Sequence, residues 1–180
     1  MPLAIKREPF TYHDLEYAPD DGKIREVIYG ELYVTAAPNT RHQRLVGELF
    51  FAIRLFLQSH PVGIVIVSPV EVVFGEQDAV QPDIVFISEK KRAIIAEKRI
   101  MGAPDWVIEV LSPSTRERDL ETKRKLYARH AVVYWAVDPD SHSLTSWDEE
   151  GERRYGVEDG VKVSVLPGFR LNLAELFDHA

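Results

Sequence analysis

Residues 105–130, DWVIEVLSPSTRERDLETKRKLYARH, join an apolar, strand-like run to a charged, helix-like run through a short loop. Successive side chains of a strand point to opposite faces, so Trp106 and Ile108 face one way, whereas Val107 and Glu109 face the other. Bulky apolar residues on both faces are typical of a central strand that is covered on both sides. The stretch therefore predicts a buried strand, followed by a helix that packs back on the same sheet.

Glu109 lies near the end of this strand, where its carboxylate should be partly removed from water. An unpaired buried carboxylate is costly, and the usual remedies are a charged partner, a proton or a metal ion. The position in the strand leaves two interpretations open. Glu109 is either part of a functional site or a carboxylate at the sheet rim that pairs with an arginine.

The helix that follows carries charged residues on the side that should face the protein. At about 100° per residue, with Leu120 at zero, Lys123 and Asp119 fall inside the apolar arc that also contains Tyr127. Asp119, Lys123 and Tyr127 thus form one i, i+4, i+8 stripe. Either Lys123 has a buried stem and a solvated head, or its amine converges with Glu109 in a site.

The remaining sequence predicts an α/β protein. An N-terminal hairpin around residues 29–30 and a long helix over residues 40–60 precede two or three strands within residues 63–88. A hairpin turning at residues 138–141, two short strands and a terminal helical turn complete the chain. This order predicts one domain, residues 1–180, with a mixed central sheet flanked by helices and an N-terminal β-hairpin extension.

Composition narrows the classes of protein. The chain has 180 residues, of which 45% are hydrophobic, enough for one core, and it has no cysteine, which excludes disulfides, thiolate zinc sites and a cysteine nucleophile. It has no apolar run of about 18 residues and no signal-peptide pattern at its start, so we expect a cytoplasmic protein without a membrane span. The net charge of −7 weighs against general coating of nucleic acid, but it permits a local basic groove or a metal that bridges to phosphate.

A second acid, Asp83, begins another apolar strand in the stretch QPDIVFI, residues 81–87. Aspartate after proline is also a common turn device. With Glu109 on a neighbouring strand, however, the two carboxylates would form an oxygen-rich site suited to Mg²⁺ or Mn²⁺. A nearby lysine could hold or help to deprotonate a metal-bound water that attacks a phosphodiester. The residues therefore indicate metal-dependent phosphodiester cleavage rather than acyl transfer.

These residues resemble a known pattern. Pro82-Asp83 followed by Glu109-x-Leu111 resembles the PD-(D/E)XK nuclease superfamily, and EVLSPST…D-x3-K-x3-Y…YWAVDP resembles, more narrowly, the Uma-type family of restriction endonucleases. The resemblance spans nearly the whole chain, including GELYV near the start and LPGFRLNLAELF near the end. It implies a restriction-endonuclease-like fold and an Mg²⁺- or Mn²⁺-dependent endonuclease, with DNA as the expected substrate.

The chain departs from the broad superfamily at one position. The usual lysine lies two residues after the glutamate, where this chain has Leu111. In the Uma-type pattern the lysine lies on the following helix, so the resemblance assigns its role to Lys123, in agreement with the helical projection. The resemblance also implies a metal held by Asp83, Glu109 and the main-chain carbonyl of Val110, with Tyr127 and Asp119 in supporting positions.

Other residues are weaker candidates for the site. Glu31, in the family-like GELYV stretch, could complete the acid cluster, whereas Glu48 lies on the polar side of its helix and is expected in solvent. His42, at the start of the long helix, could contact the site or phosphate, or be a plain surface histidine. Arg116 and Arg118 could contact a nucleic-acid backbone, or they could only offset the acids that neighbour them.

Two functions remain open from the sequence. One is the metal-dependent endonuclease, and the other is a noncatalytic nucleic-acid-binding or assembly module that keeps the nuclease fold. The acidic net charge favours the module, whereas the acid–acid–lysine set favours the enzyme, and binding of a divalent metal would distinguish them. A homodimer or higher homo-oligomer is expected by analogy with the fold class, because 180 residues offer little surface to grip a duplex.

Overall fold

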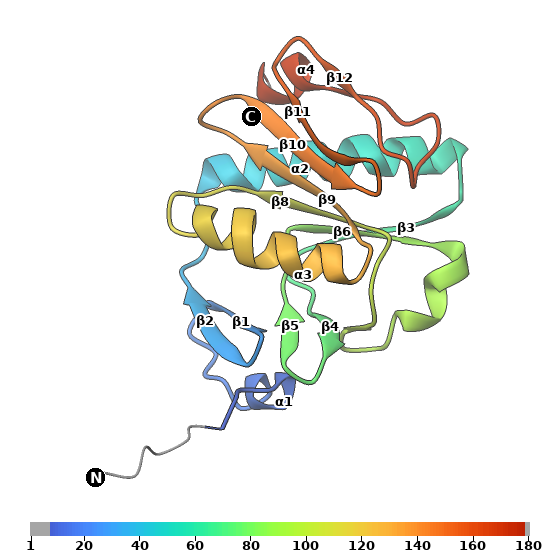
Figure 1. Cartoon of the computed structure of the whole chain (residues 1–180). Helices are drawn as coiled ribbons and strands as arrows, with labels where there is room; N and C mark the ends of the chain where they lie inside the picture. Colours follow the sequence, from blue (N-terminus) through green and yellow to red (C-terminus); the bar gives the residue numbers. More distant parts are fainter. Residues whose placement is uncertain (1–7, 179–180) are drawn as a thin grey trace.

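The strand that contains Glu109 lies inside the largest of the three sheets that the described residues form. The computed structural model describes residues 8–178, and its six-stranded sheet has the order β11-β10-β9-β8-β6-β3 (Figure 1). Every residue of β8 (Trp106–Val110) is buried, as its apolar pattern predicts. β8 pairs in parallel with β9 (Val133–Asp138) and antiparallel with β6 (Ile84–Ser88), so the sheet is mixed. The other strands of this sheet are β3 (Gly63–Val67), β10 (Ser143–Asp148) and β11 (Gly151–Tyr155).

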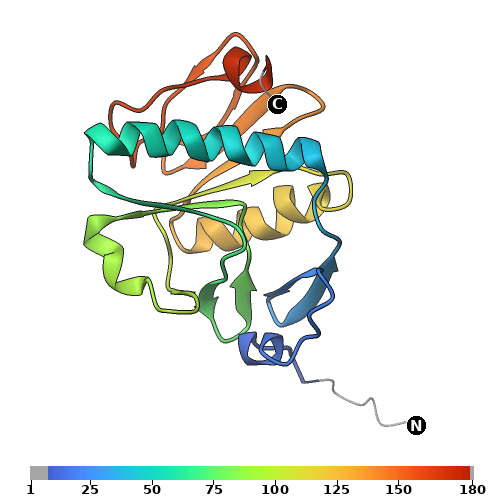
Figure 2. The same cartoon turned by 180° about the vertical axis from the view of Figure 1, so that it is seen from behind.

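Helices cover the two faces of this sheet (Figures 1 and 2). On one face, α2 (Thr40–Ser59) packs Leu45, Leu49 and Ile53 into a core with Trp106 and Ile108. The other face is covered by η2 (Arg118–Lys123) and α3 (Arg124–Arg129), whose inward residues pack with the opposite side chains of β8. Segments from the end of the chain, β12 (Gly160–Val161), β13 (Leu171–Asn172) and α4 (Leu173–Asp178), pack on the α2 side.

The predicted N-terminal hairpin is present, and it forms part of a second sheet. The hairpin strands β1 (Ile24–Ile28) and β2 (Glu31–Thr35) follow α1 (Tyr12–Leu15), and their sheet has the order β2-β1-β5-β4-β7. It also contains β4 (Val72–Gly75), β5 (Asp78–Val80) and β7 (Ile100–Met101), which follows the 3₁₀ turn η1 (Glu89–Ile94). Residues 63–88 therefore form four strands instead of two or three. Pro69 and Pro82 divide the apolar runs because proline cannot donate a ladder hydrogen bond.

The helix after β8 also differs from the prediction. Residues 118–123, η2, are π-helical, whereas residues 116–117 and α3 are α-helical. Because π-helical hydrogen bonds run from i to i+5, a uniform 100° projection misplaces residues of the first turn. Leu120 is only half-buried and Ala131 is exposed, whereas Asp119 and Lys123 are both buried. The inward position of the charged stripe thus survives the change of helix type.

Within residues 8–178, no helix is long and apolar enough to cross a membrane.

Candidate active site

The register between β6 and β8 sets Asp83 beside Glu109. Ile84 pairs with Ile108 in this antiparallel ladder, so Asp83, one residue before β6, comes opposite Glu109. The Asp83 carboxylate also accepts a hydrogen bond from the main-chain N–H of Val110, at 2.8 Å from Oδ2. The two acids therefore lie side by side at adjacent strand ends, where the sequence places them.

Lys123 reaches the same place from the helical layer. Its Nζ lies 2.9 Å from Glu109 Oε1 and 2.7 Å from Glu26 Oε1, and 3.5 Å from Asp119 Oδ1. The lysine is only 3% exposed, so its head is buried and the interpretation of a solvated head is wrong. Tyr127, one turn later, donates its hydroxyl to the same Glu109 oxygen at 2.7 Å. The predicted convergence of the amine with the carboxylate is thus present in the structure.

Burial and charge act in opposite directions on these groups. Burial raises the pKa of Glu109 above its usual range, although the Lys123 ammonium favours the ionised carboxylate. For Lys123, burial lowers the pKa, but the surrounding carboxylates of Glu109, Glu26 and Asp119 outweigh it and raise the pKa well above its ordinary value. Burial, followed by the charge of Glu109, likewise raises the pKa of Tyr127 well above 10. The amine and the phenol are therefore held protonated.

Glu26 is a member of this cluster that the sequence analysis missed. It lies on β1, is 1% exposed, and accepts a hydrogen bond from the Gln81 N–H in addition to its contact with Lys123. The available signal was the same as for Glu109, since Glu26 alternates with Ile24 and Ile28 on one face of a strand. Glu31, which the sequence favoured instead, is exposed at the start of β2 and accepts a bond from Tyr33 rather than joining the acids.

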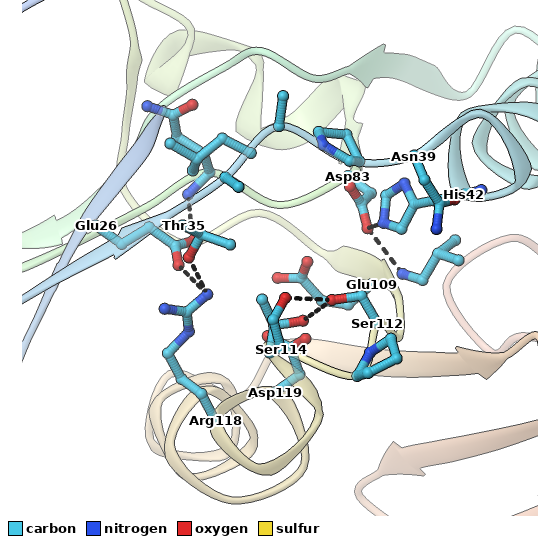
Figure 3. Close-up of a pocket in the computed structure, with 18 of the residues that line it drawn as sticks. Glu26, Thr35, Asn39, His42, Asp83, Glu109, Ser112, Ser114, Arg118 and Asp119 are labelled. Atoms are coloured by element: carbon cyan, nitrogen blue, oxygen red, sulfur yellow. Dashed lines mark hydrogen bonds and ion pairs between the residues drawn. The ribbon is translucent and has the colours of Figure 1, made fainter. Parts of the chain in front are cut away.

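His42 contacts Asp83 from the first turn of α2. Asn39 caps this helix by accepting the His42 N–H at 2.9 Å, which fixes the imidazole at the edge of the site. The His42 Nε2 lies 3.2 Å from Asp83 Oδ2 (Figure 3). Burial lowers the pKa of His42, but the bond to Asp83, its charge and the main chain of Val110 together raise it. His42 is therefore a buried neighbour of the acids and not a plain surface histidine.

The two arginines of the loop and helix start have internal partners. Arg118 donates to Thr35 Oγ1 at 2.8 Å and lies 3.4 Å from Glu26 Oε2, directed into the site (Figure 3). Arg116 pairs with Asp138 at 2.8 Å and is about half exposed. Neither contact involves the neighbouring acids on their own segment. Glu48, as expected, lies apart from the cluster, on α2 and partly exposed.

A pocket of about 260 Å³ connects these groups. Its acidic lining residues are Glu26, Asp83, Glu109 and Asp119, and its basic ones are Lys123, Arg118 and His42. The loop segments 35–39 and 112–115 complete the lining. Four carboxyl groups thus share the pocket with one lysine and one arginine, so oxygen ligands outnumber the basic side chains. A divalent cation fits such a donor set, because carboxylate oxygens are the ligands that Mg²⁺ and Mn²⁺ prefer.

A divalent cation in this pocket would meet part of a coordination shell rather than a closed cage. Within residues 8–178, no three His, Asp or Glu side chains converge on one point in a way that would hold a metal ion. Asp83 and Glu109 lie side by side at the strand ends, and the main-chain N–H of Val110 donates to Asp83 Oδ2. Such partial coordination, completed by water, is common for Mg²⁺ in proteins.

The sequence matches a protein family over residues 10–174, and that family is described as "Uma2: Putative restriction endonuclease". The chain belongs to the Uma2 family. The match covers the hairpin that carries Glu26, both strand-end acids and the helix that carries Lys123. The predicted resemblance to the Uma-type family is thereby confirmed, and Uma2 membership classes the chain as nuclease-like.

A solved structure has the same fold. It is a crystal structure of a protein from Anabaena variabilis ATCC 29413, described as a putative nuclease belonging to DUF820. The two chains share 22% sequence identity with a TM-score of 0.78, over 94% of this chain and 98% of the other. This likeness confirms the predicted α/β, restriction-endonuclease-like fold for the Uma2 chain. No curated protein sequence matches it.

Proposed function

We propose that this protein is a divalent-metal-dependent endonuclease that hydrolyses phosphodiester bonds in DNA. The observation that carries the proposal is the meeting of Asp83, Glu109 and Lys123 in one pocket, with Lys123 Nζ 2.9 Å from Glu109 Oε1. Asp83 precedes β6, Glu109 lies on β8 and Lys123 lies on η2. Burial of a charged side chain costs free energy unless it has a partner, and here the three residues lie together. Membership in the Uma2 family supports the reaction class.

Asp83 and Glu109 would hold the metal, with the main-chain carbonyl of Val110 as a third protein ligand. A bound divalent cation supplies Lewis acidity toward the phosphodiester. His42 contacts Asp83 at 3.2 Å and would keep that carboxylate aimed into the pocket. Tyr127 and Lys123 both contact Glu109 Oε1, so they would fix the second carboxylate in the same way.

Lys123 would act as a positive charge in the site. Its contacts with Glu26 and Glu109 keep the ammonium in place without a need for solvent. A fixed cation beside the reacting phosphate would stabilise negative charge that develops in the transition state. Glu26 and Asp119 would be positioning residues for this lysine, since each contacts it from a different element.

The proposal is tested with supercoiled plasmid and a matched RNA substrate, in Mg²⁺, in Mn²⁺ and in chelator. We expect DNA nicking only with metal, and a loss of about a hundredfold or more for Asp83→Asn, Glu109→Gln and Lys123→Met. The matched control is Glu48→Gln, because this partly exposed acid on α2 lies apart from the cluster. It should retain wild-type rates.

Metal binding gives a second readout that does not depend on turnover. Mn²⁺ should raise the melting temperature of the wild type and of Glu48→Gln, but not that of Asp83→Asn. Nicking that persists in all three site variants would indicate a contaminating nuclease. Absence of cleavage by the wild type on both DNA and RNA, together with absence of a Mn²⁺ shift, would instead support a noncatalytic module with a nuclease fold.

A further inference from the structure

The outer edge of β2 is an exposed apolar strand edge. Among residues 8–178, β2 lies at the end of its sheet and pairs on one side with β1. Both cartoon views show it at the margin of the molecule (Figures 1 and 2). Its Leu32 and Val34 side chains are 36% and 49% exposed. An exposed edge of this kind is a template for pairing with another strand.

The turn before β2 determines which main-chain groups face outward. Tyr29 and Gly30 have φ values of 53° and 77°, which is the pattern of a two-residue type I′ hairpin turn. The residues that flank such a turn, Ile28 and Glu31, exchange both ladder hydrogen bonds, and the pattern then alternates along the strand. The N–H and C=O groups of Leu32 and Val34 are therefore directed away from β1. The two exposed apolar residues also present the main-chain groups that a new strand would need.

We propose that this edge binds the β2 edge of a second copy of the chain, antiparallel, about a twofold axis at Tyr33. In this register, Leu32 lies opposite Val34 of the partner subunit, and Val34 lies opposite the partner's Leu32. The outward main-chain groups of both residues then form the hydrogen bonds of the ladder, because they stand in hydrogen-bonded positions. The four apolar side chains lie on one face and cover one another.

The opposite face of the same ladder is complementary in charge. Glu31 is exposed and comes opposite Thr35 of the partner subunit. The Thr35 hydroxyl accepts a hydrogen bond from Arg118 at 2.8 Å, so the pairing brings the Glu31 carboxylate beside a guanidinium of the other copy. The twofold axis repeats this contact on the second side. An unrelated extended peptide would form hydrogen bonds with the outward main-chain groups of β2. A second copy would form these hydrogen bonds, cover the apolar side chains Leu32 and Val34, and also pair the charged groups.

The pairing also has a consequence for the pocket. Thr35 and the residues that follow it, 36–38, line the candidate active site. Two copies joined at β2 would therefore open their pockets onto one continuous surface, as cleavage of both strands of a duplex requires. This consequence rests on the proposed nuclease function, whereas the interaction itself does not, and its tests use neither substrate nor metal.

The first experiment measures the oligomeric state of the full chain by analytical ultracentrifugation, with chelator and without nucleic acid. We expect a dimer whose dissociation constant rises about a hundredfold or more in Val34→Lys, because the substitution places two charges in one interface. The matched control is Leu55→Lys, an equally exposed apolar residue on α2, 52% exposed, which should remain a dimer. Equal far-UV circular dichroism spectra of the two variants would show that both remain folded.

The second experiment tests the register. The chain has no cysteine, so Tyr33→Cys introduces one thiol per copy. At a twofold axis the two substituted positions form a non-hydrogen-bonded pair with Cα atoms about 4.5 Å apart, within reach of a disulfide. Mild oxidation should give a covalent dimer for Tyr33→Cys and none for Leu55→Cys. A monomeric wild type, or a dimer that persists in Val34→Lys without cross-linking through Tyr33→Cys, would overturn the proposal.

Discussion

Replacing Lys123 with methionine removes the charge that balances three buried carboxylates while it keeps most of the side-chain volume. Lys123 Nζ lies 2.7 Å from Glu26, 2.9 Å from Glu109 and 3.5 Å from Asp119, and all four residues are less than 5% exposed. Breaking a buried ion pair by removing one partner costs about 3–5 kcal/mol, because the other charge is left uncompensated. For a chain of this length we expect the melting temperature to fall by on the order of 10 °C.

The size of this loss should depend on pH. Without the ammonium, the pKa values of Glu109 and Asp119, which burial already raises, rise further above their values in the unfolded chain. An acid whose folded pKa is raised binds more protons in the folded state, so its contribution to stability falls as pH increases. The Lys123→Met variant should therefore be much less stable than the wild type at pH 8 and closer to it at pH 5. Urea unfolding in chelator at these two pH values measures both differences.

A double variant makes the cause specific. Adding Glu26→Gln to Lys123→Met removes one of the unbalanced negative charges. At pH 8 the free energy of unfolding of the double variant should therefore exceed that of Lys123→Met by about 1–2 kcal/mol. In the wild-type background, Glu26→Gln should be destabilising. If Lys123→Met unfolds at pH 8 with the wild-type free energy, the ammonium does not compensate these carboxylates and the reasoning about the site is refuted.

Two further changes probe neighbouring contacts. Burial raises the pKa of Asp138, but bonds from Arg116, from Ser141 and from main-chain N–H groups outweigh it and lower the pKa to about 2. The stabilisation from the ionised carboxylate is therefore present above about pH 4 and is lost as pH falls through 2. Asp138→Asn should cost about 1–2 kcal/mol in urea unfolding at pH 7 and almost nothing near pH 2. Equal losses at both pH values would contradict this. Tyr127→Phe removes the hydroxyl that donates to Glu109 at 2.7 Å and should lower the free energy of unfolding by about 1–2 kcal/mol. Slower plasmid nicking is the second readout. Unchanged stability would show that this hydrogen bond contributes nothing to folding.

The parts of the site that the sequence predicted are those that depend on local periodicity. Glu109 stands out because a strand alternates and its neighbours on both faces are apolar, and all of them are buried in the structure. Lys123 stands out because a helix has one inward face, and that face survives the π-helical turn. Both inferences need only residues within one segment.

The parts that were missed depend on contacts between distant segments. Glu26 has the same strand alternation as Glu109, but its place in the cluster depends on its contacts with Gln81 and Lys123, which lie far along the chain. The second sheet is similarly hidden, because β5 and β7 are only three and two residues long and have no periodicity of their own. The π-helical turn has no residue signature, since it arises from the i to i+5 bonding that packing imposes.

The site also shows why a spacing motif is a poor description of the chemistry. Two residues after Glu109, on the same face of β8, Leu111 is 5% exposed and packs in an apolar cluster with Tyr127. The helix above that face supplies the amine instead, and Lys123 reaches Glu109 at 2.9 Å without leaving its own layer. What the carboxylate requires is a cation at hydrogen-bond distance on its buried face, because that contact makes its burial tolerable. A strand position or a helix position meets the requirement equally, so the lysine is identified by where its ammonium lies and not by its distance along the chain.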